Sequence, residues 1–240
     1  PFGGINTCIA CNQACLDHTF TMQVCSCIVN PRACHETELN FHPTKSKKRI
    51  AVVGAGPAGM AASTILAERG HHVDLFEGDN KIGGQFNMAA AIPGKEEYAQ
   101  TIRYYDRMIK KHGVHLHLNH RIAAQELKTG NYDEVILATG VTPRRVNITG
   151  IDHPMVLDYS EVLLAKKPVG KRVAIVGAGG IGFDTAELGF SYDESLISFG
   201  SNGSASLDIT YESATMSFTN FETFGFDGQE FSLEQLQAEI

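Results

Sequence analysis

The chain of 240 residues lacks any apolar stretch that approaches the roughly 18 residues needed to cross a membrane. It also does not begin with the basic and then apolar segment of a secretory signal peptide. We therefore expect no membrane partner and a cytoplasmic location. Hydrophobic residues make up 43% and charged residues 20% of the chain. This balance is typical of a soluble globular protein and argues against intrinsic disorder.

Basic residues are absent from the C-terminal part, where residues 189–240 contain no Lys or Arg but nine Asp and Glu. The 188 residues before them carry 20 basic and 18 acidic side chains. Such an abrupt change in charge predicts a boundary near Gly189. No basic face dominates any part of the chain, which argues against nucleic acid as a partner. We interpret the acids of this tail as a solvated face rather than as a metal site.

Cysteine, in contrast, is concentrated near the N-terminus. The spacing C-x2-C-x3-C-x11-C is formed by Cys8, Cys11, Cys15 and Cys27. Three thiolates within eight residues and a fourth nearby can surround one iron–sulfur cubane, because such clusters favour soft sulfur ligands. The crowding of cysteines beside a nucleotide-binding motif favours a metal site over disulfides. A zinc site and structural or disulfide-linked cysteines are the alternatives.

A glycine-rich turn follows these cysteines, between an apolar strand expected at Arg49–Val53 and a helix expected at Met60–Arg69. A second strand, Val73–Phe76, ends at Glu77. Strand, G-x-G-x-x-G turn, helix, strand and acid form the fingerprint of a Rossmann-like dinucleotide site. The glycines of the turn are Gly54, Gly56 and Gly59. The fingerprint is specific for a pyrophosphate and an adenosine ribose, so it favours FAD over FMN; a turn that serves packing alone is the alternative.

A helix is expected at about 95–111, and strands are expected at 114–118 and 134–138. His115 and His117 share one face of the first of these strands, and we interpret them as solvent-facing, with a metal site as the alternative. A further apolar strand, Arg172–Val176, precedes a second G-x-G-x-x-G. Its glycines are Gly177, Gly179 and Gly182. Two such turns predict one flavin and one nicotinamide site, but no convincing strand and acid follow the second turn, so we expect it to be incompetent here.

The predicted fold class is α/β. We expect a cluster-binding cysteine-rich loop at 1–44, a Rossmann-like FAD-binding domain at 45–168 and the truncated start of a second Rossmann-like, NAD(P)H-binding domain at 169–188. An unrelated α+β acidic tail of unknown role occupies 189–240. Alternation of apolar and polar residues predicts tail strands at 205–211 and 214–218, and a capping box at Ser232 predicts a short helix after it.

Several longer motifs resemble the C-terminal half of the NADPH-dependent 2,4-dienoyl-CoA reductases, in the flavin and iron–sulfur branch of the old yellow enzyme family. They are CIACNQACLD at 8–17, CIVNPRACHE at 27–36, IGGQFN at 82–87, IPGKEE at 92–97 and GIDHP at 150–154. The resemblance runs from about Ile5 to Glu187. The cysteine and glutamine-containing motifs are specific to this branch, whereas the glycine turns are not.

The resemblance implies an electron relay in which NADPH reduces FAD, a [4Fe-4S] cluster accepts single electrons, and an FMN domain reduces a conjugated acyl-CoA. The four cysteines named above match the cluster ligands. Cys25 and Cys34 lie outside that ligand set and would be small buried thiols, although Cys25 could compete for iron because it lies two residues from Cys27.

The resemblance also implies further flavin contacts. Ala58 would present its amide to the pyrophosphate, and Glu77 would accept hydrogen bonds from the adenosine ribose. Gly84, Gln85 and Lys95 match flavin-contacting positions, and the backbone of Ile122 would reach the adenine. Lys95 as a surface charge, Ile122 as a core residue and Glu77 as a surface carboxylate are the alternatives.

The sequence departs from this family in two places. The FMN-binding barrel is not present, and the nicotinamide domain stops after its first turn and helix. We therefore expect a fragment or a fusion: either a non-catalytic piece that binds FAD and a cluster, or a subunit that needs a separate FMN-barrel partner. No catalytic residue is predicted, and whether the chain alone is an enzyme is left open.

Overall fold

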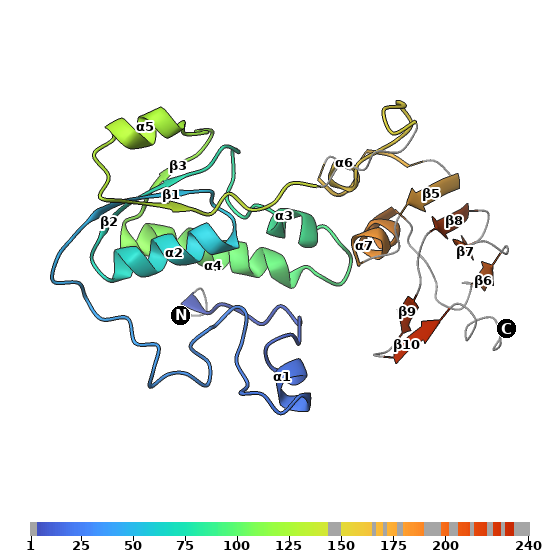
Figure 1. Ribbon diagram of the computed structural model, residues 1–240, viewed down its shortest axis with the longest axis horizontal. Coiled ribbons are helices and arrows are strands. Elements are labelled where there is room, and N and C mark those ends of the chain that lie inside the picture. Colours follow the sequence, from blue (N-terminus) through green and yellow to red (C-terminus); the bar gives the residue numbers. More distant parts are fainter. Residues whose placement is uncertain are drawn as a thin grey trace. The chain divides into compact units, whose positions relative to one another are not determined.

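The computed structural model describes residues 4–143, 150–164, 167–169, 172–176 and 180–189, together with tail strands at 198–201, 206–211, 214–219, 223–226 and 229–232. The chain forms two compact units (Figure 1). The first contains Pro1–Ala90 and Lys95–Arg145, and the second contains Ala91–Gly94 and Val146–Ile240.

A parallel four-stranded sheet forms the centre of the first unit, with strand order β3-β2-β1-β4. The strands are β1 Arg49–Val53, β2 His72–Phe76, β3 His115–His117 and β4 Glu134–Leu137. All three neighbouring pairs run parallel, and Val53 is in register with both Phe76 and Leu137. The carboxyl ends of β1, β2 and β4 therefore meet at one edge. This sheet confirms the predicted α/β class.

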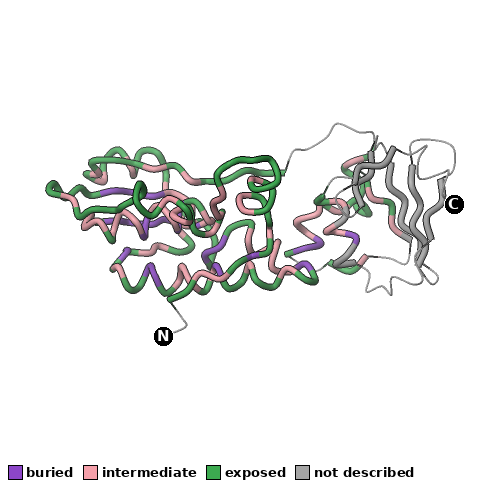
Figure 2. Tube along the Cα trace, turned by 90° about the horizontal axis from the view of Figure 1, so that it is seen from below, coloured by how far each residue is buried: buried purple, intermediate pink, exposed green. Residues whose placement is uncertain are grey.

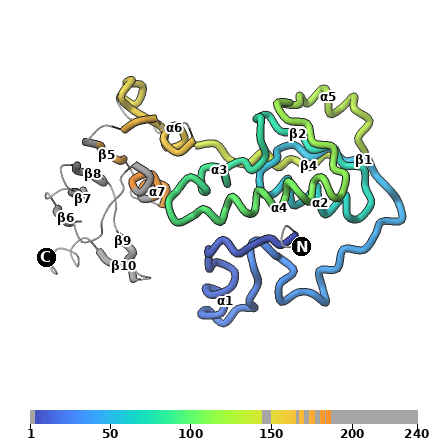
Figure 3. The backbone as a smooth tube through the Cα atoms, turned by 180° about the vertical axis from the view of Figure 1, so that it is seen from behind, coloured from blue at the N-terminus to red at the C-terminus, as the bar shows by residue number. Residues whose placement is uncertain are grey.

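Two helices pack against each other in the first unit (Figure 3): α2, Pro57–Glu68, and α4, Glu97–His112. Helix α2 begins three residues before the predicted start, because Pro57 occupies its first turn, where a missing N–H has no cost. Helix α4 ends at Gly113, which adopts the left-handed conformation with φ 70°. A short helix, α5 Ala124–Thr129, follows β3 and was not predicted.

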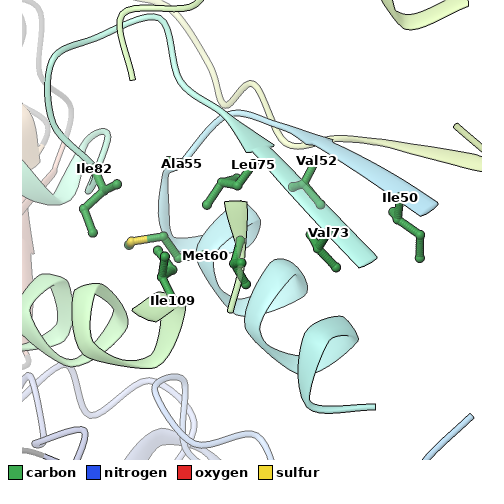
Figure 4. Packing of buried hydrophobic residues seen from close by; sticks show 9 residues of the cluster. Ile50, Val52, Ala55, Met60, Val73, Leu75, Ile82 and Ile109 are labelled. Carbon is green, nitrogen blue, oxygen red and sulfur yellow. The ribbon is translucent and has the colours of Figure 1, made fainter. Parts of the chain in front are cut away.

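The core lies between the sheet and these helices (Figures 2 and 4). The buried cluster consists of Ile50, Val52, Ala55, Met60, Val73, Leu75, Ile82, Ile109 and Val114. Val52, Met60 and Leu75 are fully buried. Each such side chain contributes roughly 1.5–3 kcal/mol of hydrophobic stabilisation. The apolar run of β1 is thus explained by its central position in the sheet.

The N-terminal segment contains one short helix, α1 Leu16–Phe20, that was not predicted, and is otherwise mainly loop. Ala10 and Asn12 adopt left-handed backbone conformations with φ 54° and 55°. Another short helix, α3 Phe86–Ala89, lies in the connection between β2 and α4.

The second unit contains α6 Tyr159–Leu163, β5 Arg172–Val176 and α7 Gly180–Gly189. Helix α6, which begins with a capping box at Asp158, packs against α7. Strand β5 joins three tail strands in a sheet of order β5-β8-β7-β6. These are β6 Ser198–Ser201, β7 Ser206–Tyr211 and β8 Ala214–Thr219.

Two tail strands, β7 and β8, lie where the alternating pattern predicts strands. Strand β8 runs parallel to β5 and antiparallel to β7. A further hairpin, which was not predicted, is formed by β9 Thr223–Phe226 and β10 Gln229–Ser232. The helix predicted after Ser232 lies outside the described residues. Across the part of the chain that the structure describes, no helix has both the length and the apolarity that a membrane span requires.

Candidate dinucleotide site and cysteine segment

Two glycines of the first turn are required by packing within the protein. Gly54 adopts φ +101°, and a Cβ atom added to it would lie 2.4 Å from the carbonyl oxygen of Ala138. A Cβ atom added to Gly59 would lie 1.8 Å from the carbonyl oxygen of Gly54. Both distances are far below van der Waals contact, so the strand ends and α2 can approach this closely only without side chains at these positions.

Gly56 differs from its neighbours. Its φ of −72° and ψ of −177° are accessible to any residue, and a Cβ atom added to it would meet nothing within 4 Å. Neither backbone strain nor packing requires glycine here, and the position borders open space. Gly56 is the N-cap of α2, whose first turn contains no acidic residue. Free backbone N–H groups and the positive end of the helix dipole make this turn suited to an anion.

Glu77 is held against the same turn. The N–H of Ala55 donates to Glu77 Oε2 at 2.7 Å, and the N–H of Asp79 donates to Oε1 at 3.1 Å. The N–H of Gly54 donates to the carbonyl of Phe76 at 2.8 Å. Glu77 is half-buried, and these bonds fix its carboxylate at the end of β2, where two further lone-pair directions are available to hydroxyl donors.

A second loop, residues 82–87, borders the turn. The N–H of Gly83 donates to the carbonyl of Ala55 at 2.8 Å, and a Cβ atom added to Gly84 would lie 3.0 Å from Gly56 Cα. The Asn87 side chain donates to the carbonyls of Ile82 at 3.0 Å and Gly84 at 3.1 Å. Sequence reasoning assigned no role to Asn87, although its amide holds this loop in place.

Four other residues were predicted to contact the cofactor: Gln85, Ala58, Lys95 and Ile122. Gln85 Nε2 donates to the carbonyl of Val141 at 2.9 Å, which links the second loop to the segment after β4. Ala58 is exposed in the first turn of α2. Lys95 is half-buried just before α4, and Ile122 is half-buried between β3 and α5. Their contacts with a cofactor stay predictions.

The second glycine turn is only partly described. Gly182 is half-buried within α7. Gly177 and Gly179 lie outside the described residues, so the nicotinamide site stays a prediction.

Asp74, in the middle of β2, is buried beside an arginine and two histidines. Its Oδ2 accepts a hydrogen bond from Arg49 at 3.3 Å, and its Oδ1 lies 3.0 Å from His117 Nε2 and 3.6 Å from His115 Nδ1. Desolvation by burial opposes ionisation of Asp74, but hydrogen bonds from His117 and Tyr132 and the charge of Arg49 outweigh it, so the pKa of this carboxyl is lowered. The side chains of His115 and His117 are 77% and 40% exposed, in agreement with their interpretation as solvent-facing, and both also lie beside Asp74.

The N-terminal cysteines lie in a loop that is partly ordered by hydrogen bonds. The N–H of Ala10 donates to Cys8 Sγ at 3.3 Å, and the N–H of Ser26 donates to the carbonyl of Ala14 at 2.7 Å. The second bond joins the immediate neighbours of Cys15 and Cys27. None of the six cysteines forms a disulfide. Among the described residues, no group of three or more His, Cys, Asp or Glu side chains is gathered in a metal-binding arrangement.

Cys34 corrects one expectation: it is exposed, not buried, and Cys25 is half-buried. The pKa of Cys34 is raised, first by local desolvation and then by the neighbouring Cys25 thiol. Cys34 lies in a left-handed backbone conformation with φ 64°.

The chain is similar to known redox proteins. Residues 48–202 match the family model for pyridine nucleotide-disulphide oxidoreductase. A metal reductase from Desulforamulus reducens is 35% identical over 188 residues, which are 77% of this chain and 28% of the relative. A cinnamate reductase from Clostridium sporogenes is 33% identical over 182 residues, which are 76% of this chain and 27% of that protein.

Two solved structures of redox enzymes are also similar to this chain. A 2-naphthoyl-CoA reductase in complex with 2-naphthoyl-CoA aligns with a TM-score of 0.74 at 37% identity, over 78% of this chain and 28% of the other. A histamine dehydrogenase from Rhizobium sp. 4-9 aligns with a TM-score of 0.65 at 26% identity, over 77% of this chain and 30% of the other. The chain therefore spans less than a third of the length of these relatives.

Proposed function

Since the chain belongs to the pyridine nucleotide-disulphide oxidoreductase family, we propose that residues 45–168 bind FAD at the turn between β1 and α2. In this proposal the chain is the electron-transfer part of a flavin and iron–sulfur oxidoreductase. Electrons pass from NADPH to FAD, then to a [4Fe-4S] cluster held by residues 1–44, and finally to an FMN-barrel domain or partner. The reductases and dehydrogenase among its relatives support the general class of function.

The observation that carries this proposal is the open position at Gly56. Gly54 and Gly59 are explained by contacts inside the protein, but Gly56 has an ordinary backbone conformation and open space beside it. A glycine there is explained when a ligand must approach the backbone closely. The adjacent start of α2, with its free N–H groups, would hold the pyrophosphate of FAD.

The surrounding residues would orient the cofactor. Glu77 would accept hydrogen bonds from the ribose hydroxyls while Ala55 and Asp79 hold its carboxylate in place. Gly84 and Gln85 would border the flavin side of the site, with Asn87 holding their loop. Bound FAD supplies an acceptor of two electrons that can release them one at a time.

The cysteine segment fits an iron–sulfur cluster by its chemistry. It offers four soft ligands in Cys8, Cys11, Cys15 and Cys27, and the backbone N–H bond to Cys8 Sγ is of the kind that stabilises thiolate ligands. The thiols would converge when they bind the cluster, because metal sites commonly assemble with their metal.

The proposed function extends to the class of substrate that the complete enzyme would reduce. The motifs that resemble 2,4-dienoyl-CoA reductases and the similarity to a 2-naphthoyl-CoA reductase both favour a conjugated acyl-CoA as the final acceptor of the complete enzyme. The turn with Gly177, Gly179 and Gly182 would belong to the nicotinamide site.

Gly56→Val tests the proposal. Valine can adopt the backbone conformation of Gly56 and meets no atom at its Cβ, so the variant should fold normally, yet it should raise the Kd for FAD by about tenfold or more by obstructing the pyrophosphate. Binding is measured by quenching of flavin fluorescence, and folding by circular dichroism. Ala99→Val, on an exposed position of α4, is the control. Equal FAD affinity of wild type and Gly56→Val would refute the assignment of the site.

A further inference from the structure

One cation beside Glu77 has no role in the proposed function. Residues 117–121 run along the end of β2 and are fixed there by three backbone hydrogen bonds. The N–H of Glu77 donates to the carbonyl of His117 at 2.9 Å, the N–H of His120 donates to the carbonyl of Glu77 at 2.8 Å, and the N–H of Asn119 donates to the carbonyl of Asp79 at 2.8 Å. Arg121 follows directly in this ordered segment.

The side chain of Arg121 lies over Gly78, the residue after Glu77. A Cβ atom added to Gly78 would lie 3.7 Å from both Cβ and Nε of Arg121 and 3.8 Å from its Nη2. Two guanidinium nitrogens of Arg121 therefore lie close to Gly78, the residue that follows the predicted ribose-binding acid. Arg121 is exposed, and within the described ranges no side chain or carbonyl forms a hydrogen bond or ion pair with it.

We propose that Arg121 binds the adenine ring of FAD by stacking its guanidinium on the base. The inference rests on the proposed function and extends it to the adenosine end of the cofactor. In FAD the ribose separates the adenine from the pyrophosphate. If the pyrophosphate lies at the start of α2 and the ribose at Glu77, the base extends past Glu77, where the guanidinium of Arg121 offers a flat surface beside Gly78.

Arginine suits this role by its shape as well as its charge. Its guanidinium is planar and weakly hydrated, and it stacks on aromatic rings, whereas the ammonium group of lysine is a compact and strongly hydrated point charge. Stacking on a base therefore requires arginine, whereas attraction to the phosphates would be satisfied by lysine. This difference separates the two ways in which Arg121 could act.

The experiment compares Arg121→Ala and Arg121→Lys with the wild-type chain by calorimetric titration. The probes are FAD, ADP, which lacks the flavin, and FMN, which lacks the adenosine. Both variants should weaken FAD and ADP by the same factor of about five to ten, and this loss should change little with salt concentration. Arg107→Ala removes an exposed arginine from α4 and should leave both affinities unchanged. The weak affinity for FMN should be the same in all variants.

Other outcomes would overturn the inference. Wild-type affinity in Arg121→Lys would mean that the charge acts on the phosphates, and wild-type affinity in Arg121→Ala would mean that the side chain does not contact the cofactor. A wild-type chain that binds neither FAD nor ADP would overturn the proposed function itself. FAD binding by the wild type together with an unaffected Arg121→Ala would overturn only the role of Arg121.

Discussion

Two glycines of the first turn, Gly59 and Gly56, should differ in how an added methyl group affects the stability of the fold. In Gly59→Ala the new Cβ would start 1.8 Å from the carbonyl oxygen of Gly54, and both nearest atoms belong to the backbone. To reach an ordinary contact of 3.4 Å, α2 and the turn would have to separate by about 1.6 Å, the difference between these distances. No side chain can rotate away to relieve this overlap.

The cost can be estimated. Overpacking of this kind destabilises by about 3 kcal/mol, and the better helix propensity of alanine returns about 1 kcal/mol, so the net loss is about 2 kcal/mol. For a chain of this size the melting temperature should fall by about 4–8 °C. Gly56→Ala should change it by less than about 3 °C, because its methyl group meets no atom and only the N-cap preference is affected.

Thermal unfolding followed by circular dichroism, without cofactor, measures both variants. FAD titration of the folded variants then completes the comparison, since Gly56→Ala should lose affinity despite its near-normal stability. A melting temperature of Gly59→Ala within about 1 °C of the wild type would refute the close approach of α2 to the turn.

Three further predictions concern stability and the cysteines. Asp74→Asn should lower the free energy of unfolding by about 1–2 kcal/mol in urea denaturation at neutral pH, because Arg49 and His117 lose a charged acceptor; an unchanged midpoint would contradict the network. Because folding lowers the pKa of Asp74, its contribution is complete above the ordinary carboxyl pKa of 3.8 and is lost as the pH falls through the folded value. The wild type should therefore lose its advantage over Asp74→Asn on acidification, and parallel stability profiles of the two proteins would argue against this. Cys11→Ser should lose the iron and sulfide of anaerobically purified protein while Cys25→Ser retains them, and equal contents in both variants would be evidence against the assigned ligands.

Local patterns predicted the secondary-structure elements that surround the first glycine turn. The apolar run at Arg49–Val53, the glycines after it and the strand that ends at Glu77 are found as β1, the turn to α2 and β2. These elements are encoded by neighbouring residues, because a buried parallel strand is a continuous apolar run and the turn needs its glycines. Helix α2 begins before the predicted Met60 because Pro57 occupies its first turn, which the pattern of apolar residues does not encode.

Features that depend on register could not be predicted in this way. Asp74 is buried and surrounded by Arg49 and two histidines because β1, β2 and β3 align in a particular register, which no local pattern encodes. The position of Arg121 over Gly78 likewise depends on hydrogen bonds between segments about 40 residues apart in the chain. The pairing of β8 with β5 is a long-range contact of the same kind.

The central claim, that this chain binds both FAD and an iron–sulfur cluster, is tested most directly by the absorption spectrum of protein purified without oxygen and supplied with FAD, combined with analysis of the flavin, iron and sulfide that it releases. The account predicts flavin bands together with broad sulfur-to-iron absorption, and the release of FAD with about four iron and four sulfide per chain. Release of FMN alone, absence of flavin at saturating FAD, or one zinc without sulfide would contradict it.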